Sequence, residues 1–295
     1  MIKSILVAID ESISSKSALN VGVELSKLLG AKIKGLYIEN IARLLEQQPS
    51  IMSTSPGSSR DAQHLLSTTK EKEVEQEFLE EGLCLNAIFE ETCRKVDVKG
   101  SFSRNRGKVD DLLIEASRAV DLVVVGRRGK TFPENSKKPG PTTESLLRHT
   151  ARPVLVVPAE AQTTARIRES KLAEQIIIAY DGSNNAQRAL AIGTMFAKFR
   201  NSKVEVVSVS DDPKISGKSI NESIEFISPY ELDVTYKTMT GANKPWKAIM
   251  QRVKNFEAGL IVIGAFGENR LVELIFGSTT REILMHANCP VLLCR

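Results

Sequence analysis

The residues best suited to chemistry form a glycine-rich pattern near the end of the printed sequence. Gly264-Ala-Phe-Gly267 is followed, after nine residues, by Gly277-Ser278-Thr279. Glycines let a backbone turn sharply and let a ligand approach it closely. If a helix begins at Ser278, the free backbone N–H groups of its first turn favour an anion, because the positive end of the helix dipole lies there. The pattern therefore predicts a phosphate site.

A carboxylate is expected beside this phosphate site. Asp181 follows the apolar run 176–180, and Gly264 ends the apolar run 260–263. If both runs are parallel strands, both residues lie at the carboxyl edge of the sheet, where such folds bind ligands. A carboxylate there suits a ribose hydroxyl or a metal-bound phosphate. Turn glycines and a serine helix cap alone would also fit the glycines, but the paired aspartate favours a binding site.

An internal repeat indicates which elements must position these residues. Ile5-Leu-Val-Ala-Ile-Asp10 returns as Ile176-Ile-Ile-Ala-Tyr-Asp181, and Val123-Val-Val-Gly126 returns as Ile261-Val-Ile-Gly264. The offset is 171 residues at the aspartates (181 − 10) and 138 at the glycines (264 − 126), so the first copy holds 33 more residues over this span.

Apolar runs alternate with amphipathic stretches in both copies. The predicted strands are 3–9, 32–38, 96–102, 121–126 and 153–157, then 175–180, 203–209, 232–238, 259–264 and 290–294. The predicted helices are 14–29, 72–94, 108–118 and 143–149, then 185–199, 244–256 and 278–286. Alternation of strand and helix predicts parallel crossovers, and continuously apolar central strands indicate helices on both faces. The predicted fold class is α/β, with two repeated doubly wound domains.

The expected domain organisation follows the repeat. Domain 1 is expected at 1–158, a polar linker at 159–172 and domain 2 at 173–295. Domain 1 carries an insertion at about 39–70, which includes a Ser-, Pro- and Gly-rich segment, 48–60, expected to be a mobile loop. The corresponding connection in domain 2, 211–231, is expected to hold only a short helix.

Taken together, these features resemble the universal stress protein family in its tandem form, with two domains in one chain. The apolar strand ending in Asp181, the Gly-x2-Gly-x9-Gly-Ser pattern and the final run Pro290-Val-Leu-Leu carry the resemblance, which covers the whole length. It implies a five-stranded parallel sheet with helices on both faces in each domain, an adenine nucleotide alpha hydrolase-like fold.

The resemblance also implies ATP binding in domain 2. The implied nucleotide-binding residues are Ala179, Tyr180, Asp181, Gly182, Ser183, Val209, Gly264, Gly267, Gly277, Ser278 and Thr279. Val209 would contact adenine through its backbone, and Asp181 would lie beside the ribose or a Mg²⁺ ion that accompanies the nucleotide.

The first copy departs from the pattern. It reads Gly126-Arg-Arg-Gly129, ten residues, then Gly140-Pro141-Thr142, so the spacer is one residue longer and a proline removes one amide donor. A ligand loop in this copy would use Asp10, Gly126, Arg127, Gly129, Gly140 and Thr142. Five basic residues crowd this loop: Arg127, Arg128, Lys130, Lys137 and Lys138. A different anion and a merely solvated basic loop both remain open here.

Composition narrows the function class. The net charge of +4 and the aromatic content of 5% do not favour a nucleic-acid partner. No apolar run approaches the roughly 18 residues of a membrane span, so a cytoplasmic protein without a membrane partner is expected. The four cysteines form no CxxC pair. A P-loop, a dinucleotide fingerprint and a nucleophile elbow are all missing from the sequence.

The leading hypothesis is an ATP-binding tandem universal stress protein, a stress-response or regulatory module with nucleotide in domain 2. No catalytic residue is assigned, and hydrolysis would be slow at most. A weak Mg²⁺-dependent ATP hydrolase or phosphotransfer protein is one alternative, and a module for a non-nucleotide ligand or a protein is another. The final strands 154–157 and 291–294 are expected to meet edge to edge as an intramolecular pseudo-dimer, and a further homodimer stays open.

Overall fold

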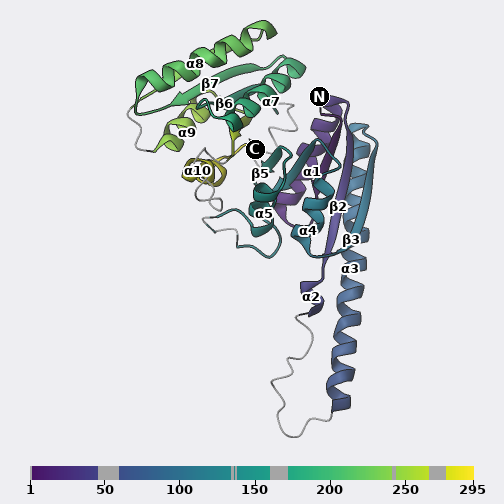
Figure 1. Ribbon diagram of the computed structural model, residues 1–295. Helices are drawn as coiled ribbons and strands as arrows, with labels where there is room; N and C mark the ends of the chain where they lie inside the picture. Colours follow the sequence, from purple (N-terminus) through teal and green to yellow (C-terminus); the bar gives the residue numbers. More distant parts are fainter. Residues whose placement is uncertain are drawn as a thin grey trace.

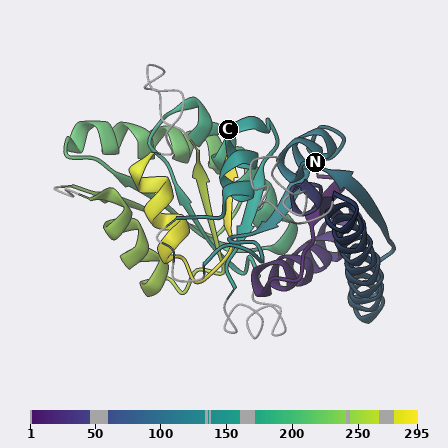
Figure 2. The same cartoon turned by 90° about the horizontal axis from the view of Figure 1, so that it is seen from below.

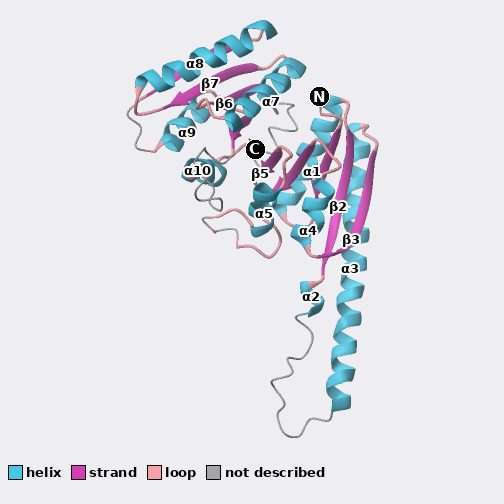
Figure 3. Cartoon of the chain, in the orientation of Figure 1, coloured by secondary structure: helices cyan, strands magenta, loops and turns pink. Residues whose placement is uncertain are grey.

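The computed structural model describes residues 2–45, 60–133, 136, 138–159, 172–240, 244–265 and 277–295. The strands in these residues form one continuous sheet in the order β3-β2-β1-β4-β5-β10-β9-β6-β7-β8. Figures 1 and 3 show its two halves, with β2, β3 and β5 labelled in the first and β6 and β7 in the second. The first half contributes β1 (Ser4–Ala8), β2 (Lys32–Asn40), β3 (Gly100–Gly107), β4 (Leu122–Gly126) and β5 (Val154–Val157). The second half contributes β6 (Gln175–Ala179), β7 (Lys203–Val209), β8 (Val234–Met239), β9 (Leu260–Gly264) and β10 (Val291–Cys294).

All strand pairs within each half are parallel, which confirms the expected doubly wound α/β arrangement. Between the halves, β5 and β10 pair antiparallel, with Leu155 opposite Leu292. The final strands of the two copies therefore meet edge to edge, as predicted from their apolar sequences. This pairing joins the two five-stranded sheets into one, so the edges formed by β5 and β10 are covered.

Helices cover both faces of the sheet, because alternate residues of each central strand point to opposite sides. Ile5 and Val7 pack with one helix layer, whereas Leu6 packs with the other. The first layer holds α1 (Ile13–Leu29), α3 (Arg60–Val96), α7 (Asn184–Arg200) and α8 (Pro213–Ile227). The second layer holds α4 (Val109–Ser117), α5 (Pro141–His149), α9 (Pro245–Asn255) and α10 (Ser278–His286). Short helices occur at α2 (Ala42–Leu45) and η1 (Ser228–Tyr230).

The first helix of each copy begins in the same way. The Ser12 hydroxyl accepts a hydrogen bond from the Ser15 amide at 3.1 Å, and the Ser183 hydroxyl accepts one from the Ala186 amide at 3.2 Å. These are side-chain N-caps, each of which satisfies one otherwise unpaired donor of the first turn. The caps therefore set where α1 and α7 begin, at the sheet edge where the two copies of the repeat carry their aspartates.

The helix after the second strand differs most from the sequence-based prediction. Helix α3 has 37 residues and begins at Arg60, twelve residues earlier than predicted. Both views place it at the first half's end of the sheet, and in Figure 1 its N-terminal part extends past α2 and beyond the other elements. The predicted loop 48–60 otherwise lies outside the described residues, as does most of the predicted linker, 160–171.

In the second half, the prediction of only a short helix between 211 and 231 was wrong. Helix α8 has 15 residues, with Asp212 as its N-cap and Pro213 in its first turn. The Asp212 carboxylate accepts a hydrogen bond from the Lys214 amide at 2.8 Å. An aspartate followed by proline is a common helix start, so the signal was present in the sequence.

Strand β3 begins four residues later than the predicted start at residue 96. Asp97 adopts a left-handed conformation, with φ of 58°, and ends α3. The Val98 amide donates to the Cys93 carbonyl at 3.0 Å, which closes the last turn of the helix. The alternation Val-Asp-Val therefore belongs to a helix end rather than to a strand. No helix in the described residues is both long enough and apolar enough to cross a membrane.

Candidate functional site

The second half places Asp181 just beyond the carboxyl end of β6. Its Oδ1 accepts a hydrogen bond from the Ser183 amide at 3.0 Å, and the side chain is exposed. Between them, Gly182 has a φ of 84°, a conformation that glycine adopts at little cost. The turn therefore presents a solvent-facing carboxylate next to the N-terminus of α7.

Gly264 brings the end of β9 against that same helix N-terminus. A Cβ at this position would lie 2.6 Å from the Ala186 nitrogen, so any larger residue would displace backbone atoms. The Asn185 side chain spans the same junction, donating to the Ala265 carbonyl at 2.6 Å. Asp181 and Gly264 thus both lie at the first turn of α7, as expected of residues at one carboxyl edge.

Helix α10 begins directly after Gly277, which is its N-cap residue, and Gly277 and Ser278 are exposed. Among the described residues, no side chain caps this N-terminus. The amides of Gly277, Ser278 and Thr279 have no acceptor four residues earlier within the helix, so an anion could be held there. Gly267, the remaining glycine of the predicted pattern, lies outside the described residues.

A pocket of about 390 Å³ opens beside Asp181. Its lining residues come from the turn after β6 and from one face of α8: Asp181, Gly182, Ser183, Ile215, Lys218, Ser219 and Glu222. Three of these were predicted as nucleotide-binding residues. The four from α8 were not, because that helix was expected to be short. They give the pocket one lysine, one further carboxylate and one apolar side chain.

Tyr180 contacts the helix that lines the pocket. Its side chain is buried, and its hydroxyl donates to the Glu222 carboxylate at 3.2 Å. Burial, followed by the negative charge of Glu222, raises the pKa of the Tyr180 phenol above its ordinary value. The phenol therefore stays protonated and holds α8 beside the turn after β6. Ala179 ends β6, and Val209 ends the neighbouring strand β7 with its side chain partly buried.

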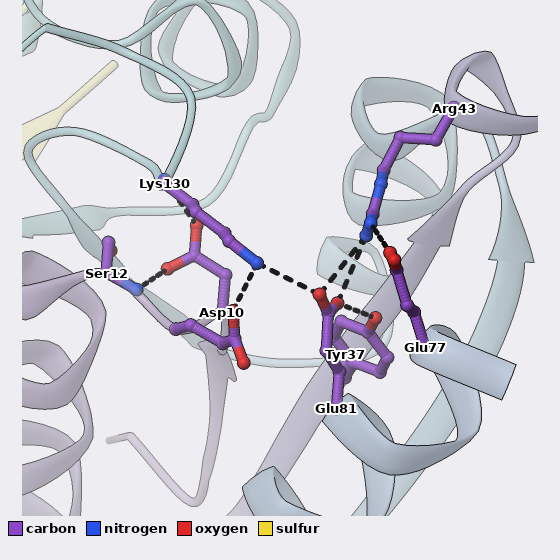
Figure 4. Close-up of polar contacts among 8 residues, drawn as sticks. Asp10, Ser12, Tyr37, Arg43, Glu77, Glu81 and Lys130 are labelled. Carbon is purple, nitrogen blue, oxygen red and sulfur yellow. Dashed lines mark hydrogen bonds and ion pairs between the residues drawn. The ribbon is translucent and has the colours of Figure 1, made fainter. Parts of the chain in front are cut away.

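The first half repeats the aspartate turn, and there backbone amides contact both oxygens of the carboxylate. Asp10 accepts hydrogen bonds from the Ser12 amide at 2.9 Å and from the Lys130 amide at 3.2 Å (Figure 4). A Cβ on Gly129 would lie 3.0 Å from the second carboxylate oxygen. Both oxygens of Asp10 are thus engaged by the chain itself.

The basic loop of the first half is also engaged by carboxylates. The Lys130 ammonium forms ion pairs with Glu11 and, at 2.9 Å, with Glu81 of α3 (Figure 4). Hydrogen bonds to Glu11 and then to Glu81 raise the pKa of Lys130. Glu81 additionally accepts a hydrogen bond from Tyr37 at 2.7 Å and pairs with Arg43 at 3.2 Å. We call these residues, Glu11, Tyr37, Arg43, Glu81 and Lys130, the Lys130 cluster.

The two arginines of this loop donate hydrogen bonds to backbone carbonyl groups. Arg128 donates to the Lys138 carbonyl at 3.4 Å, and Arg127 reaches the C-terminal end of α10. Gly140 donates its amide to the Arg127 carbonyl at 2.9 Å, and Pro141 begins α5. Gly126 is packed against the first turn of α1, and Thr142 is partly buried in the first turn of α5. Lys137 lies outside the described residues.

The predicted helices 143–149 and 278–286 each end at a histidine. His149 ends α5 and His286 ends α10, and the Nδ1 atom of each lies 2.8 Å from the carbonyl four residues earlier. Within the residues described, no group of three or more His, Cys, Asp or Glu is arranged to hold a metal ion.

Comparisons with known proteins agree on one family. The sequence model of the universal stress protein family matches residues 1–158 and 227–295. A universal stress protein of Synechocystis sp. is 25% identical over 300 residues, which cover 99% of this chain and 100% of that protein. A shorter universal stress protein of Thermus aquaticus is 29% identical over 133 residues, 41% of this chain and 97% of the relative.

Solved structures support the same fold. A universal stress protein from Archaeoglobus fulgidus superposes with a TM-score of 0.70 at 20% identity, covering 99% of this chain and 98% of that one. A putative universal stress protein from Pseudomonas aeruginosa gives a TM-score of 0.63 at 17% identity, covering 99% and 93%. At these identities the likeness establishes the arrangement of helices and strands.

Proposed function

Since the chain belongs to the universal stress protein family, we propose that it is an ATP-binding member whose nucleotide site lies in its second half. The observation that carries this proposal is the meeting of Asp181 and Gly264 at the first turn of α7, beside a pocket of about 390 Å³. Ligands of open α/β sheets bind at this edge. We treat 1–158 and 173–295 as its two domains.

The polar groups of the second half suit a nucleotide. The N-terminus of α10 begins at a glycine and offers amide donors to phosphate oxygens. Lys218, which lines the pocket, adds a positive charge, while Asp181 offers an exposed acceptor to a ribose hydroxyl. The adenine would contact the backbone near Val209, and Ala179, Tyr180, Gly182 and Ser183 would form the floor of the site.

A magnesium ion fits this site as a companion of ATP. Mg²⁺ in nucleotide sites takes one or two carboxylates together with substrate phosphates, rather than a complete set of protein ligands. Asp181, whose carboxylate is exposed beside the pocket, would supply one such ligand. Mg²⁺ would neutralise phosphate charge when bound.

The first half is not part of the proposed ATP site. Asp10 has both oxygens engaged, and the Lys130 ammonium pairs with Glu11 and Glu81. Nucleotide phosphates would have to compete with these carboxylates. The family membership and the single proposed site together favour a regulatory stress-response module rather than an enzyme with two working sites.

Isothermal titration of the full chain with Mg²⁺ and ATP tests the proposal. Wild type should bind ATP, and Gly277→Val should not, because the valine would fill the space at the N-terminus of α10. Among the described residues, a Cβ on Gly277 lies nearest to the Thr280 hydroxyl, at 3.9 Å, so the described part of the fold has room for the substitution. Gly217→Val is the matched control, since a Cβ on Gly217 meets no described atom within 4 Å.

The outcomes separate the alternatives. No binding by wild type at millimolar ATP would show that the proposal is wrong and leave a non-nucleotide ligand as the better hypothesis. Equal binding by wild type and Gly277→Val would show that ATP binds away from the N-terminus of α10. Release of phosphate that depends on Mg²⁺ and is lost in Asp181→Ala would instead favour the weak hydrolase.

A further inference from the structure

One arginine of the first half holds the end of a helix in the second half. Arg127 follows β4 and is buried, with 7% of its surface exposed. Its Nη1 lies 3.0 Å from the Ala287 carbonyl oxygen, 3.1 Å from that of Leu284 and 3.4 Å from that of Met285. The guanidinium therefore donates to the C-terminal carbonyl groups of α10.

These contacts suit the chemistry of a helix end. The last four carbonyls of a helix lack partners within it, and a cation is favoured there by the dipole. Leu284 and Ala287 are each 1% exposed, so water has little access to replace the arginine. The contact is thus a buried, charge-assisted clamp across the boundary between the halves.

The opposite end of the same helix carries the proposed phosphate donors. Helix α10 has nine residues, so Ser278 and the clamped carbonyls are separated by little more than two turns. A short helix moves as one body. Fixing its C-terminal carbonyls therefore restricts where the amides of Gly277 and Ser278 lie, and such positioning is what an anion site requires.

The repeat shows that this clamp is not shared equally by the halves. The residue after the strand-ending glycine is Arg127 in the first copy and Ala265 in the second. Alanine cannot make the reciprocal contact to α5. Arg295 instead donates to the Arg148 carbonyl near the end of α5. The glycine loop of the first half therefore carries an arginine that contacts a helix of the second half.

We propose that Arg127 is a positioning residue for the nucleotide site of the second half, acting through α10. The inference rests on the proposed function, because it assigns Arg127 to ATP binding in a site that it does not touch. It assigns the degenerate loop of the first half a role: the loop supports the ATP site of the other half.

The first experiment compares ATP binding by full-length wild type, Arg127→Met and Arg295→Met. Methionine keeps the apolar length of the side chain but removes all its donors. We expect Arg127→Met to weaken the ATP Kd about tenfold, within the usual range of coupling between sites. Arg295→Met removes an inter-half contact of the same type at the other helix, and its Kd should equal that of wild type. Arg127→Lys, which keeps the charge, should lie between and serves if Arg127→Met does not fold.

The second experiment needs no nucleotide. Hydrogen exchange of the α10 amides, followed by mass spectrometry of peptides from 278–286, should be several-fold faster in Arg127→Met than in wild type or Arg295→Met. Trp246 provides an optical check, since its ring stacks on His286 with centroids 4.7 Å apart at the same end of α10. It is the only tryptophan, so the indole emission comes from this one site, where Lys247 also lies over the ring, 5.7 Å from its centroid.

The two experiments fail in different ways. If wild type binds ATP and a folded Arg127→Met binds it with the same Kd, the positioning inference is overturned while the proposed function stands. Unchanged exchange of α10 in Arg127→Met also overturns it. If wild type binds no ATP, the proposed function is overturned, and with it the assignment of Arg127 to nucleotide binding, whatever the exchange shows.

Discussion

The Nζ of Lys130 lies 2.9 Å from Oε1 of Glu81, which ties the loop after β4 to the long helix α3. With the pair to Glu11, this ion pair compensates the Lys130 ammonium, so an anion at this loop would have to compete with two carboxylates. Glu81 lies nearly 50 residues before Lys130 in the chain, so the pairing depends on the packing of α3 over β2 and β3. The same pair makes the first half sensitive to acid.

The first prediction concerns the stability of the Lys130 cluster at low pH. Burial alone would raise the pKa of Glu81, but hydrogen bonds from Tyr37 and Lys130 outweigh it, and the pKa falls below its usual 4.5. A carboxylate whose pKa is lowered by folding stabilises the protein fully above about 4.5, and this stability is lost as the pH falls through the folded-state pKa.

Glu81→Gln should therefore be less stable than wild type at pH 7, by about 1–2 kcal/mol for a charged hydrogen-bonding group. The difference should shrink as the pH falls below about 4.5. Urea unfolding between pH 7 and pH 3 measures this, with Glu73→Gln as the control on an exposed face of α3. The same pH dependence in wild type and Glu81→Gln would contradict the prediction.

Much of the fold was predictable because the central strands are continuous apolar runs and the chain repeats itself. Helix α8 escaped because serines occupy its buried face, where an apolar stripe would be expected. Ser216 and Ser223 are fully buried, and their hydroxyls donate to carbonyls three residues earlier in the helix. These local hydrogen bonds make burial of a polar side chain acceptable and hide the helix from a hydrophobic pattern.

The candidate site likewise holds some residues that the sequence predicted and others that it did not. Asp181 and Gly264 were found from spacing, because a strand end and its glycine are local signals. Lys218, Glu222 and Glu81 were missed, since the residues that a helix presents to a strand end depend on how it packs. Nothing in the neighbouring sequence marks them.

The second prediction separates the two aspartates that share a repeat position. If only the second half binds nucleotide, Asp181→Asn should weaken ATP binding about tenfold, as the loss of one charged hydrogen bond would. Asp10→Asn should leave ATP binding unchanged, because the Asp10 carboxylate is engaged by the Ser12 and Lys130 amides. Calorimetry should give one ATP per chain. Two sites, or a loss in Asp10→Asn, would show that the first half also binds.

The third prediction concerns the four thiols. Cys84 is exposed, while Cys93, Cys289 and Cys294 are buried. Burial raises the pKa of Cys294 to about 12, so its reactive thiolate is scarce at neutral pH. An aromatic disulfide reagent at pH 8 should react quickly with one thiol in the folded protein and with four after unfolding. Cys84→Ser should then show no fast reaction, and a second fast thiol in that variant would contradict the burial of the others.

The last prediction concerns a buried ion pair in the second half. Glu205 lies in β7 with 2% of its side chain exposed, and both of its oxygens accept hydrogen bonds from Arg252 of α9, at 2.8 and 2.6 Å. Removing the partner of a buried charge costs about 3 kcal/mol or more, because the remaining charge is left without compensation. Arg252→Met should therefore lower the free energy of unfolding by about 3 kcal/mol.

Two further variants make this prediction specific. Arg281→Met breaks the exposed contact between Arg281 and Glu282, 3.5 Å apart, and should cost less than about 1 kcal/mol. Combining Arg252→Met with Glu205→Leu should restore most of the lost stability, because a buried ion pair can often be exchanged for apolar side chains of similar size. Urea unfolding followed by circular dichroism measures all three. If the double variant is no more stable than Arg252→Met alone, lost packing of the arginine stem, rather than the unpaired Glu205 carboxylate, accounts for the destabilisation.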